Sequence, residues 1–266
     1  MLKPKVCVLR SAGTNCDQET AAAFSLAGAA VELLHINSLV SARRTFDEFH
    51  ILALPGGFSY GDDVASGKIF ANELRFKLAD SLVKFIAEGK LIIGICNGFQ
   101  ILVKSGFLPG DINLSQTTSL IINDSGKFES RWVYLKSSVV SRQSSVKCVW
   151  AKNLPEVIYL PVAHGEGKFV VGDKQVLNRL KINNQIVFQY SDAAGNFSGY
   201  PDNPNGSVEN IAGICDQTGR VLGLMPHPER HIHGAQHPRK DELKPGEGAE
   251  GLQIFKNGVD FIRKHF

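Results

Sequence analysis

Cys96 stands where a strand-like run gives way to a helix-like one. The apolar residues 91–95 precede it, and the helical pattern of 97–106 follows it directly. Glycines two places to either side, Gly94 and Gly98, would let a strand and a helix approach closely. A thiol on such a turn, at the N-terminus of a helix, gains thiolate character and can act as a nucleophile. The alternative is a buried cysteine at the end of a strand.

A histidine and a glutamate later in the chain could activate this thiol. Glu229 follows His227 with Pro228 between them, in the segment MPHPER. Prolines on both sides of the histidine favour an extended backbone, in which residues i and i+2 point to the same side. Glu229 would then orient the imidazole, leaving its other nitrogen for the thiol. Alone the segment also fits a solvated turn, but with Cys96 it provides nucleophile, base and orienting carboxylate.

A glycine-rich turn could complete the site with hydrogen-bond donors. The strand-like run ILAL ends in Pro-Gly-Gly, so backbone N–H groups become free to point away from the sheet. The N–H of Gly57, or of its neighbours Gly56 and Phe58, could stabilise a developing oxyanion together with the N–H of Asn97. The turn is a weak signal when taken alone. The phosphate-binding pattern G-x-x-x-x-G-K-[ST] does not occur in the sequence.

These residues need a scaffold, and the first hundred residues predict one. Strand-like and helix-like segments alternate there, which predicts βαβ units and an α/β fold. We expect a mostly parallel, flavodoxin-like sheet with helices on both faces, and a ligand site beyond the carboxyl ends of the strands. The strand-like segments are 5–10, 31–36, 50–57 and 91–95, and the helix-like segments are 15–28, 68–89 and 97–106.

The second half of the chain changes character. Residues 118–138 and 183–192 are rich in strand-forming residues and polar turns, which predicts an antiparallel addition to the sheet. Residues 196–207 read as a loop, and 208–230 as a hairpin around DQTG. An amphipathic helix closes the chain. With no internal repeat and no linker, residues 1–266 are expected to form a single domain.

The composition excludes several classes of protein. The chain has 266 residues, 43% hydrophobic and 21% charged, and a formal net charge of +3 without a dense basic cluster, so we expect no nucleic acid partner. No apolar window is long enough to span a membrane. The cysteines form no C-x-x-C pair, which suits a reducing compartment and predicts a cytoplasmic protein. Four of them are expected to be small core residues: Cys7, Cys16, Cys148 and Cys215.

The segments GICNGFQIL, LPGGFSYGDD and MPHPER resemble those of class I, or triad, glutamine amidotransferases. In particular they are similar to the glutaminase subunits of phosphoribosylformylglycinamidine synthase, which act in purine biosynthesis. The resemblance continues through RSAGTNCDQE, FESRWV, AHGEGKF and YPDNPNGS, and so covers nearly the whole chain.

The resemblance implies a role for each candidate residue. Cys96 would attack the side-chain amide of glutamine to form a thioester, His227 would shuttle the proton, and Glu229 would orient His227. Backbone amides would cradle the oxyanion, and Gln100 would lie near the bound glutamine. The segment FESRWV and His164 would line the site or face a partner. The substrate-binding set is then Gly56, Gly57, Phe58, Asn97 and Gln100.

The resemblance also implies partners. Ammonia would pass to an ATP-dependent synthetase subunit that converts formylglycinamide ribonucleotide to formylglycinamidine ribonucleotide, with a small third subunit in the same enzyme. ATP and Mg²⁺ would be used by the synthetase, and this chain would hold no cofactor. We expect weak activity without the partner. The polar segment 231–250 would be a solvated loop against the partner, and its histidines, His231, His233 and His237, would bind no metal.

Three other interpretations remain open. A class I glutaminase of another biosynthetic complex would use the same triad. A cysteine hydrolase on the same kind of sheet would also place a thiol between strand and helix, but would not need the His-x-Glu pair. A non-enzymatic scaffold with a degenerate site is disfavoured, because the three residues of the triad are all present.

Overall fold

The computed structural model describes residues 2–110, 113–138, 148–242 and 248–266. Within these ranges a nine-stranded sheet has the order β2-β1-β3-β4-β11-β10-β9-β6-β7. Its strands are Lys5–Arg10 (β1), Ala30–His35 (β2), Ile51–Leu54 (β3), Leu91–Ile95 (β4), Glu129–Ser137 (β6), Val157–His164 (β7), Ile186–Ser191 (β9), Ile211–Cys215 (β10) and Val221–Leu224 (β11). A separate antiparallel pair joins Thr118–Ile121 (β5) to Lys168–Val171 (β8).

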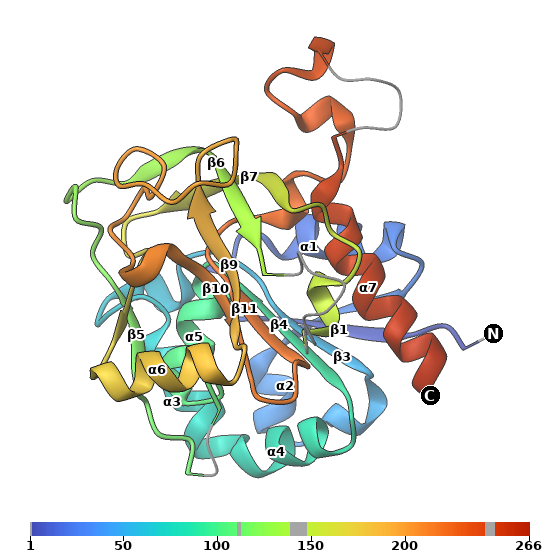
Figure 1. Cartoon of the computed structure of the whole chain (residues 1–266). Helices are drawn as coiled ribbons and strands as arrows, with labels where there is room; N and C mark the ends of the chain where they lie inside the picture. Colours follow the sequence, from blue (N-terminus) through green and yellow to red (C-terminus); the bar gives the residue numbers. More distant parts are fainter. Residues whose placement is uncertain (1, 111–112, 139–147, 243–247) are drawn as a thin grey trace.

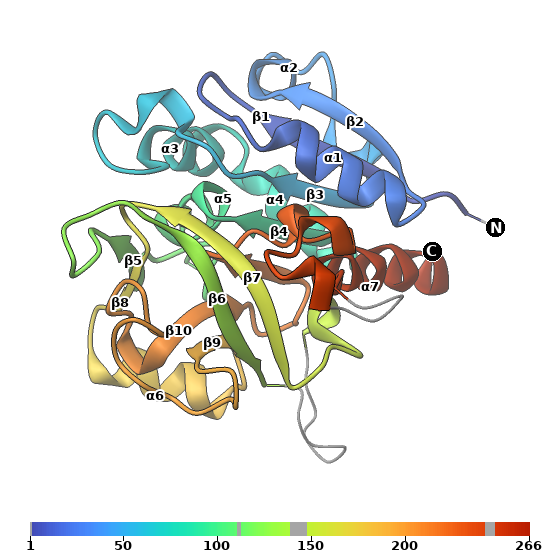
Figure 2. The same ribbon diagram turned by 90° about the horizontal axis from the view of Figure 1, so that it is seen from above.

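The parallel half of the sheet contains β2, β1, β3, β4 and β11. Its inner strands are continuous apolar runs, and every residue of β3 and β4 is buried. Strands of this kind require cover on both faces. α1 packs against α7, and α3 packs against α4 and α5, so that two helical layers flank the sheet (Figures 1 and 2).

The helices begin and end as the chain's glycines and charges suggest. Gly28, Gly89 and Gly106, which follow α1, α4 and α5, all have positive φ angles, as is usual after a helix. The helices are Asp17–Leu26 (α1), Ile36–Val40 (α2), Lys68–Lys77 (α3), Ala79–Ala87 (α4), Asn97–Ser105 (α5), Lys174–Ile182 (α6) and Glu250–His265 (α7). No helix in the described ranges is long and apolar enough to cross a membrane.

The predicted helix over 68–89 is wrong in one respect, because it is broken into α3 and α4. The break is at Leu78, whose φ of −131° is not helical and whose side chain is buried. Arg75 and Lys77 occupy the last turn of α3, and Asp80 the first turn of α4. Each charge favours the helix end next to it, so the local electrostatics support two helices.

The predicted antiparallel addition is confirmed. β10 and β11 form the hairpin around DQTG, and β9, β6 and β7 continue the sheet in antiparallel register. β6 and β7 are its last two strands and curve over the edge where the parallel strands end (Figure 2). The fold class is therefore the predicted α/β arrangement.

Candidate active site

The residues expected to do chemistry follow three neighbouring strands. β4 lies between β3 and β11, and all three run in the same direction (Figure 1). Gly56 comes after β3, Cys96 after β4 and His227 after β11. The carboxyl edge of the sheet therefore gathers all three, as the alternating pattern of the sequence predicts.

Cys96 sits on a sharp turn between β4 and α5. Its backbone angles, φ 52° and ψ −106°, are unfavourable for a residue with a side chain and mark stored strain. The N–H of Cys96 donates to Leu224 O at 2.8 Å, which ties the turn to β11. A Cβ at Gly98 would collide with the carbonyl oxygen of Leu54, so the turn needs that glycine. The thiol is nearly buried and lies 3.7 Å from Ala163 O.

His227 and Glu229 form the predicted contact, although not through the predicted backbone. Nδ1 of His227 lies 2.6 Å from Oε1 of Glu229, and both side chains are buried. The expected extended conformation is wrong, because Pro228–Arg230 form a turn of 3-10 helix. The fixed φ of proline suits the first position of such a turn. The N–H of His227 donates to Pro161 O of β7 at 2.8 Å, which anchors the imidazole beneath that strand.

The surroundings of His227 favour its protonated form. Burial opposes the charge, but the Glu229 carboxylate and the thiols of Cys96 and Cys16 outweigh it and raise the pKa of His227 well above its usual range. Nε2 is buried and makes no well-directed hydrogen bond within the described residues. A Cβ at Gly56 would lie 2.8 Å from His227 Cε1, 3.1 Å from Cys16 Sγ and 3.5 Å from Cys96 Cβ. Glycine at this position thus leaves room for the imidazole and both thiols.

The candidate oxyanion donors differ in availability. The N–H of Phe58 donates to Gly13 O at 2.9 Å and is therefore engaged. No hydrogen bond of the N–H of Gly57 or of Asn97 is found among the described residues. Gly57 also has a φ of 147°, which favours glycine. The geometry leaves these two amides for a substrate oxygen, and their role stays a prediction.

The side chains of Asn97 and Gln100 hold the site together from within. Oδ1 of Asn97 accepts from the N–H and the hydroxyl of Ser59, at 3.2 and 2.5 Å. Nδ2 of Asn97 donates to Oε1 of Gln100 at 2.9 Å, and Nε2 of Gln100 donates to Glu166 O at 2.6 Å. These bonds fasten α5 to the loops after β3 and β7. Contact between Gln100 and the substrate stays a prediction.

His164, which was expected to line the site or face a partner, is a buried residue at the end of β7. Nδ1 lies 3.1 Å from Oδ1 of Asn123, and Nε2 lies 3.5 Å from Nδ2 of Asn205. Burial, together with the positive charges of His227 and Arg131, lowers the pKa of His164 to about 4. The imidazole is therefore neutral near pH 7, with Nδ1 as donor to Asn123.

Sequence reasoning missed Cys16, which it assigned to the core as a small hydrophobic residue. Cys16 is buried, but a ligand atom from each of Cys16, His227 and Glu229 lies within 4.8 Å of the others. Its position after β1, at the same carboxyl edge, was the available signal. Such a set could bind a soft divalent metal. The expected absence of a metal stays a prediction.

The histidine-rich segment after the triad is solvated only in part, because His233 and residues 238–241 are exposed but two of its histidines are not. His231 is fully buried and His237 nearly so, and their rings pack on Trp132 and Tyr159 of β6 and β7. Nδ1 of His231 donates to Tyr159 O at 2.8 Å. The aromatic outer face of this hairpin requires cover, which the histidines provide. Residues 243–247 of the segment lie outside the described residues, and contact with a partner stays a prediction.

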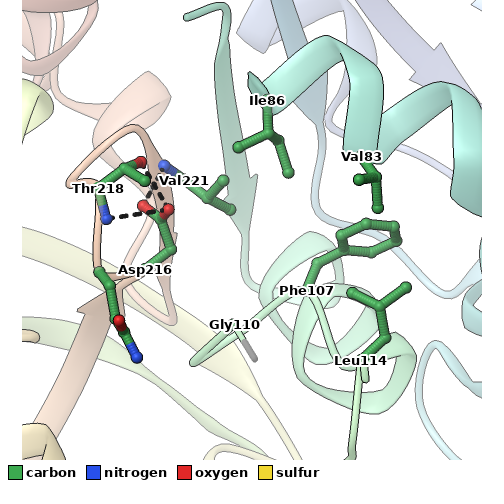
Figure 3. A pocket seen from close by; sticks show the side chains of 9 residues that line it. Val83, Ile86, Phe107, Gly110, Leu114, Asp216, Thr218 and Val221 are labelled. Carbon is green, nitrogen blue, oxygen red and sulfur yellow. Dashed lines mark hydrogen bonds between the residues drawn. The ribbon is translucent and has the colours of Figure 1, made fainter. Parts of the chain in front are cut away.

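A cavity at the opposite ends of the strands is a separate feature (Figure 3). Val221, in its wall, begins β11 and pairs with Ile92 near the start of β4. None of the predicted site residues lines it. Its lining consists of Val83, Ile86, Phe107, Gly110, Leu114, Asp216, Gln217, Thr218 and Val221.

Comparisons with known proteins agree with this geometry. Residues 3–262 match the family model described as a CobB/CobQ-like glutamine amidotransferase domain. The phosphoribosylformylglycinamidine synthase subunit PurQ of Dehalococcoides mccartyi is 48% identical over 265 residues, covering 99% of this chain and 100% of that protein. The PurQ protein from Archaeoglobus fulgidus is 44% identical over 275 residues, covering 98% and 97%.

Solved structures extend the comparison. PurLQS from Thermotoga maritima matches with a TM-score of 0.73 and 30% identity, covering 98% of this chain and 100% of that one. A putative GMP synthase protein from Thermoplasma acidophilum matches with a TM-score of 0.59 at 14% identity, which shows a shared fold alone. The identity over nearly the full length of the curated relatives decides the assignment: this chain belongs to the PurQ family of phosphoribosylformylglycinamidine synthase subunits, within the CobB/CobQ-like glutamine amidotransferases.

Proposed function

We propose that this chain hydrolyses glutamine with Cys96, His227 and Glu229 and delivers ammonia to an ATP-dependent synthetase subunit. As a member of the PurQ family it is the glutamine amidotransferase part of phosphoribosylformylglycinamidine synthase in purine biosynthesis. One observation carries the catalytic assignment: the strained thiol at the carboxyl end of β4 meets a buried imidazole–carboxylate pair at the end of β11. These are the parts of a nucleophile–base–orienter triad.

The first half of the reaction forms a thioester. His227 takes the thiol proton, and the thiolate of Cys96 attacks the amide carbon of glutamine. The carbonyl oxygen becomes an oxyanion, which the N–H groups of Gly57 and Asn97 would stabilise. His227 then returns the proton to the amide nitrogen, the C–N bond breaks, and ammonia leaves. The raised pKa of His227 and the Glu229 carboxylate favour the imidazolium that these reaction steps require.

The second half regenerates the enzyme. His227 takes a proton from a water molecule, whose oxygen attacks the thioester carbon. The same two amides face the second oxyanion, the C–S bond breaks, and glutamate leaves. His227 returns its proton to the sulfur of Cys96. Water therefore supplies the hydroxyl of glutamate, and one proton of ammonia comes from the thiol.

The released ammonia is used only if it reacts with an activated electrophile. The proposed partner activates the amide oxygen of formylglycinamide ribonucleotide with ATP and Mg²⁺, and formylglycinamidine ribonucleotide is the product. The similar chain from Thermotoga maritima belongs to a structure of PurLQS, which supports assembly with the synthetase subunit. A further small subunit is part of the proposal. Hydrolysis by the free chain would waste glutamine, so we expect the loaded synthetase to stimulate it.

The state of the cysteines bears on where the chain works. All five are free thiols. Free thiols persist in reducing compartments, and on this basis we place the protein in the cytoplasm.

Release of ammonia from glutamine tests the proposal. The purified chain is assayed alone, and then with the synthetase, ATP, Mg²⁺ and formylglycinamide ribonucleotide, with Cys96→Ala as control. We expect strong stimulation by the loaded partner and no release in the variant. A Cys96-dependent rate of ammonia release that is the same with and without this partner would point to another biosynthetic complex. Release that survives in Cys96→Ala would overturn the triad.

A further inference from the structure

Arg131 on β6 presents an unpaired edge of its guanidinium. Nε and Nη2 are both buried, and neither makes a hydrogen bond among the described residues. Glu129 Oε2 lies 3.2 Å from Nη2, close enough for an ion pair but poorly directed. The side chain as a whole is 27% exposed, so the unpaired atoms form its inner part. Two adjacent N–H groups on one edge are the arrangement that binds a carboxylate with two parallel hydrogen bonds.

Unpaired donors on a buried cation are costly, and structures rarely keep them without a use. The ring of Tyr200 lies over the guanidinium, with Cζ 4.7 Å from its centre, and holds the group in place. The cation is thus fixed by stacking, while its hydrogen-bonding edge is left vacant. That combination is expected of a binding group rather than of a structural ion pair.

The strand register places this edge close to the nucleophile. Ser130 pairs with Ala163, whose carbonyl oxygen lies 3.7 Å from Cys96 Sγ. Glu129 and Arg131 stand on either side of Ser130, and alternation along a strand turns both side chains to the same face. Neighbouring strands are about 5 Å apart, so these two charges lie within an amino acid's reach of the thiol.

The two charges have opposite signs, as do the two ends of an α-amino acid. The Glu129 side chain is buried; Oε1 accepts from the hydroxyl of Ser125 at 2.8 Å, and Oε2 faces Arg131. Glu129 and Arg131 offset each other's charge, so a ligand with only one charge would leave one charge in excess at this site. A zwitterion leaves none in excess.

We propose, building on the glutaminase function above, that Arg131 binds the α-carboxylate of glutamine and Glu129 binds its α-ammonium. The pair holds the amino acid end of the substrate while the side-chain amide reaches Cys96. Free glutamine is then preferred over amides that lack either charged group. This makes the two residues specificity-determining, beyond the triad and the oxyanion donors.

Three substrates separate the roles of the two residues. Glutamine is compared with 4-aminobutanamide, which lacks the carboxylate, and with glutaramate, which lacks the amine. The measured quantity is kcat/KM for ammonia release by the complex with the loaded synthetase. We expect Arg131→Met to lower kcat/KM for glutamine about 10- to 100-fold, mainly through KM. In this variant the ratio of kcat/KM for glutamine to kcat/KM for 4-aminobutanamide should fall by the same factor. Glu129→Gln should instead lower the ratio of kcat/KM for glutamine to kcat/KM for glutaramate.

Two further variants control for structural effects. Arg131→Lys keeps the charge without the two-pronged geometry and should give an intermediate ratio. Lys136→Met removes a cation from the opposite face of the same strand and should leave both ratios at the wild-type value.

Loss of activity toward all three substrates by one common factor, in Arg131→Met and Arg131→Lys alike, would overturn the inference and leave Arg131 a structural role. Failure of the proposed function looks different, because the wild-type complex would then release no Cys96-dependent ammonia from glutamine. The ratios report recognition even where a variant is partly unfolded, since the folded fraction cancels.

Discussion

Nη2 of Arg230 lies 3.1 Å from Sγ of Cys16, which sets a second thiol and a cation beside the imidazole of His227. The thiol of Cys16 also interacts with His227 and contributes to the raised pKa of that residue. Burial in turn raises the pKa of the Cys16 thiol, although His227 and Arg230 oppose this. Cys16 is therefore protonated at neutral pH and acts on the base through its thiol.

The first prediction concerns this second thiol. Cys16→Ala should lower the pKa of His227, because one of the groups that favour the imidazolium is removed. Titration of the His227 ring by NMR measures the pKa directly. Cys7→Ala, which changes a buried cysteine in the middle of β1, is the matched control and should leave the titration unchanged. Equal His227 pKa values in wild type and Cys16→Ala would contradict the prediction.

The second prediction concerns the strain at Cys96. Cys96→Ala and Cys96→Gly should both abolish glutamine hydrolysis, by more than about a thousandfold. Glycine accepts φ 52° and ψ −106° without penalty, whereas alanine keeps the strain. Cys96→Gly should therefore be about 1 kcal/mol more stable than Cys96→Ala, after allowing for the greater chain entropy of glycine when unfolded. Urea unfolding of the two variants shows which of them has the larger free energy of unfolding. A less stable glycine variant would mean that the turn is unstrained.

Sequence patterns predicted the sheet and the strand–helix turn at Cys96 because both depend on local signals. The apolar run before Cys96 is buried along its length, and the glycines around it are required by steric contact with neighbouring backbone. The hairpin around DQTG is set by its own turn residues. In each case the information lies within about ten residues of the feature.

The features that were mispredicted depend on residues far apart in the chain. The contact between His227 and Glu229 was expected from an extended backbone, but the pair is held by a bond to Pro161 in β7. Cys16 looks like any small apolar residue until Gly56 and His227 are placed beside it. His231 is buried because Trp132 offers it an aromatic surface. No local pattern carries such information.

The third prediction separates two glycines by what surrounds them. A Cβ at Gly56 would press on side-chain atoms of His227 and Cys16, which can shift slightly. Gly56→Ala should therefore fold but lose about a hundredfold in kcat, because the imidazole is displaced. A Cβ at Gly98 would meet the backbone of Leu54, which cannot move without disturbing β3. Gly98→Ala should instead destabilise the fold by about 3 kcal/mol.

Thermal unfolding and steady-state kinetics on both variants test this contrast. A Gly56→Ala enzyme with wild-type kcat would show that the imidazole and thiols have more room than the structure gives them. A Gly98→Ala protein with wild-type stability would show that α5 can move away from β3.

The fourth prediction is a pH dependence of stability from His164. Its pKa is about 4 in the folded protein and about 6.5 in an unfolded chain. Between these values the unfolded state binds more protons, so the free energy of unfolding falls as the pH is lowered. The stabilisation is complete above pH 6.5, and about 3 kcal/mol of it is lost by pH 4. His164→Gln should lack this slope, so its stability deficit relative to wild type should shrink by that amount on acidification. Urea unfolding of both proteins between pH 7 and pH 4 measures this change in stability. The control is His233→Gln, at an exposed site, which is expected to follow the wild type. Parallel curves for wild type and His164→Gln would show that the imidazole of His164 is protonated in the folded state as readily as in the unfolded chain.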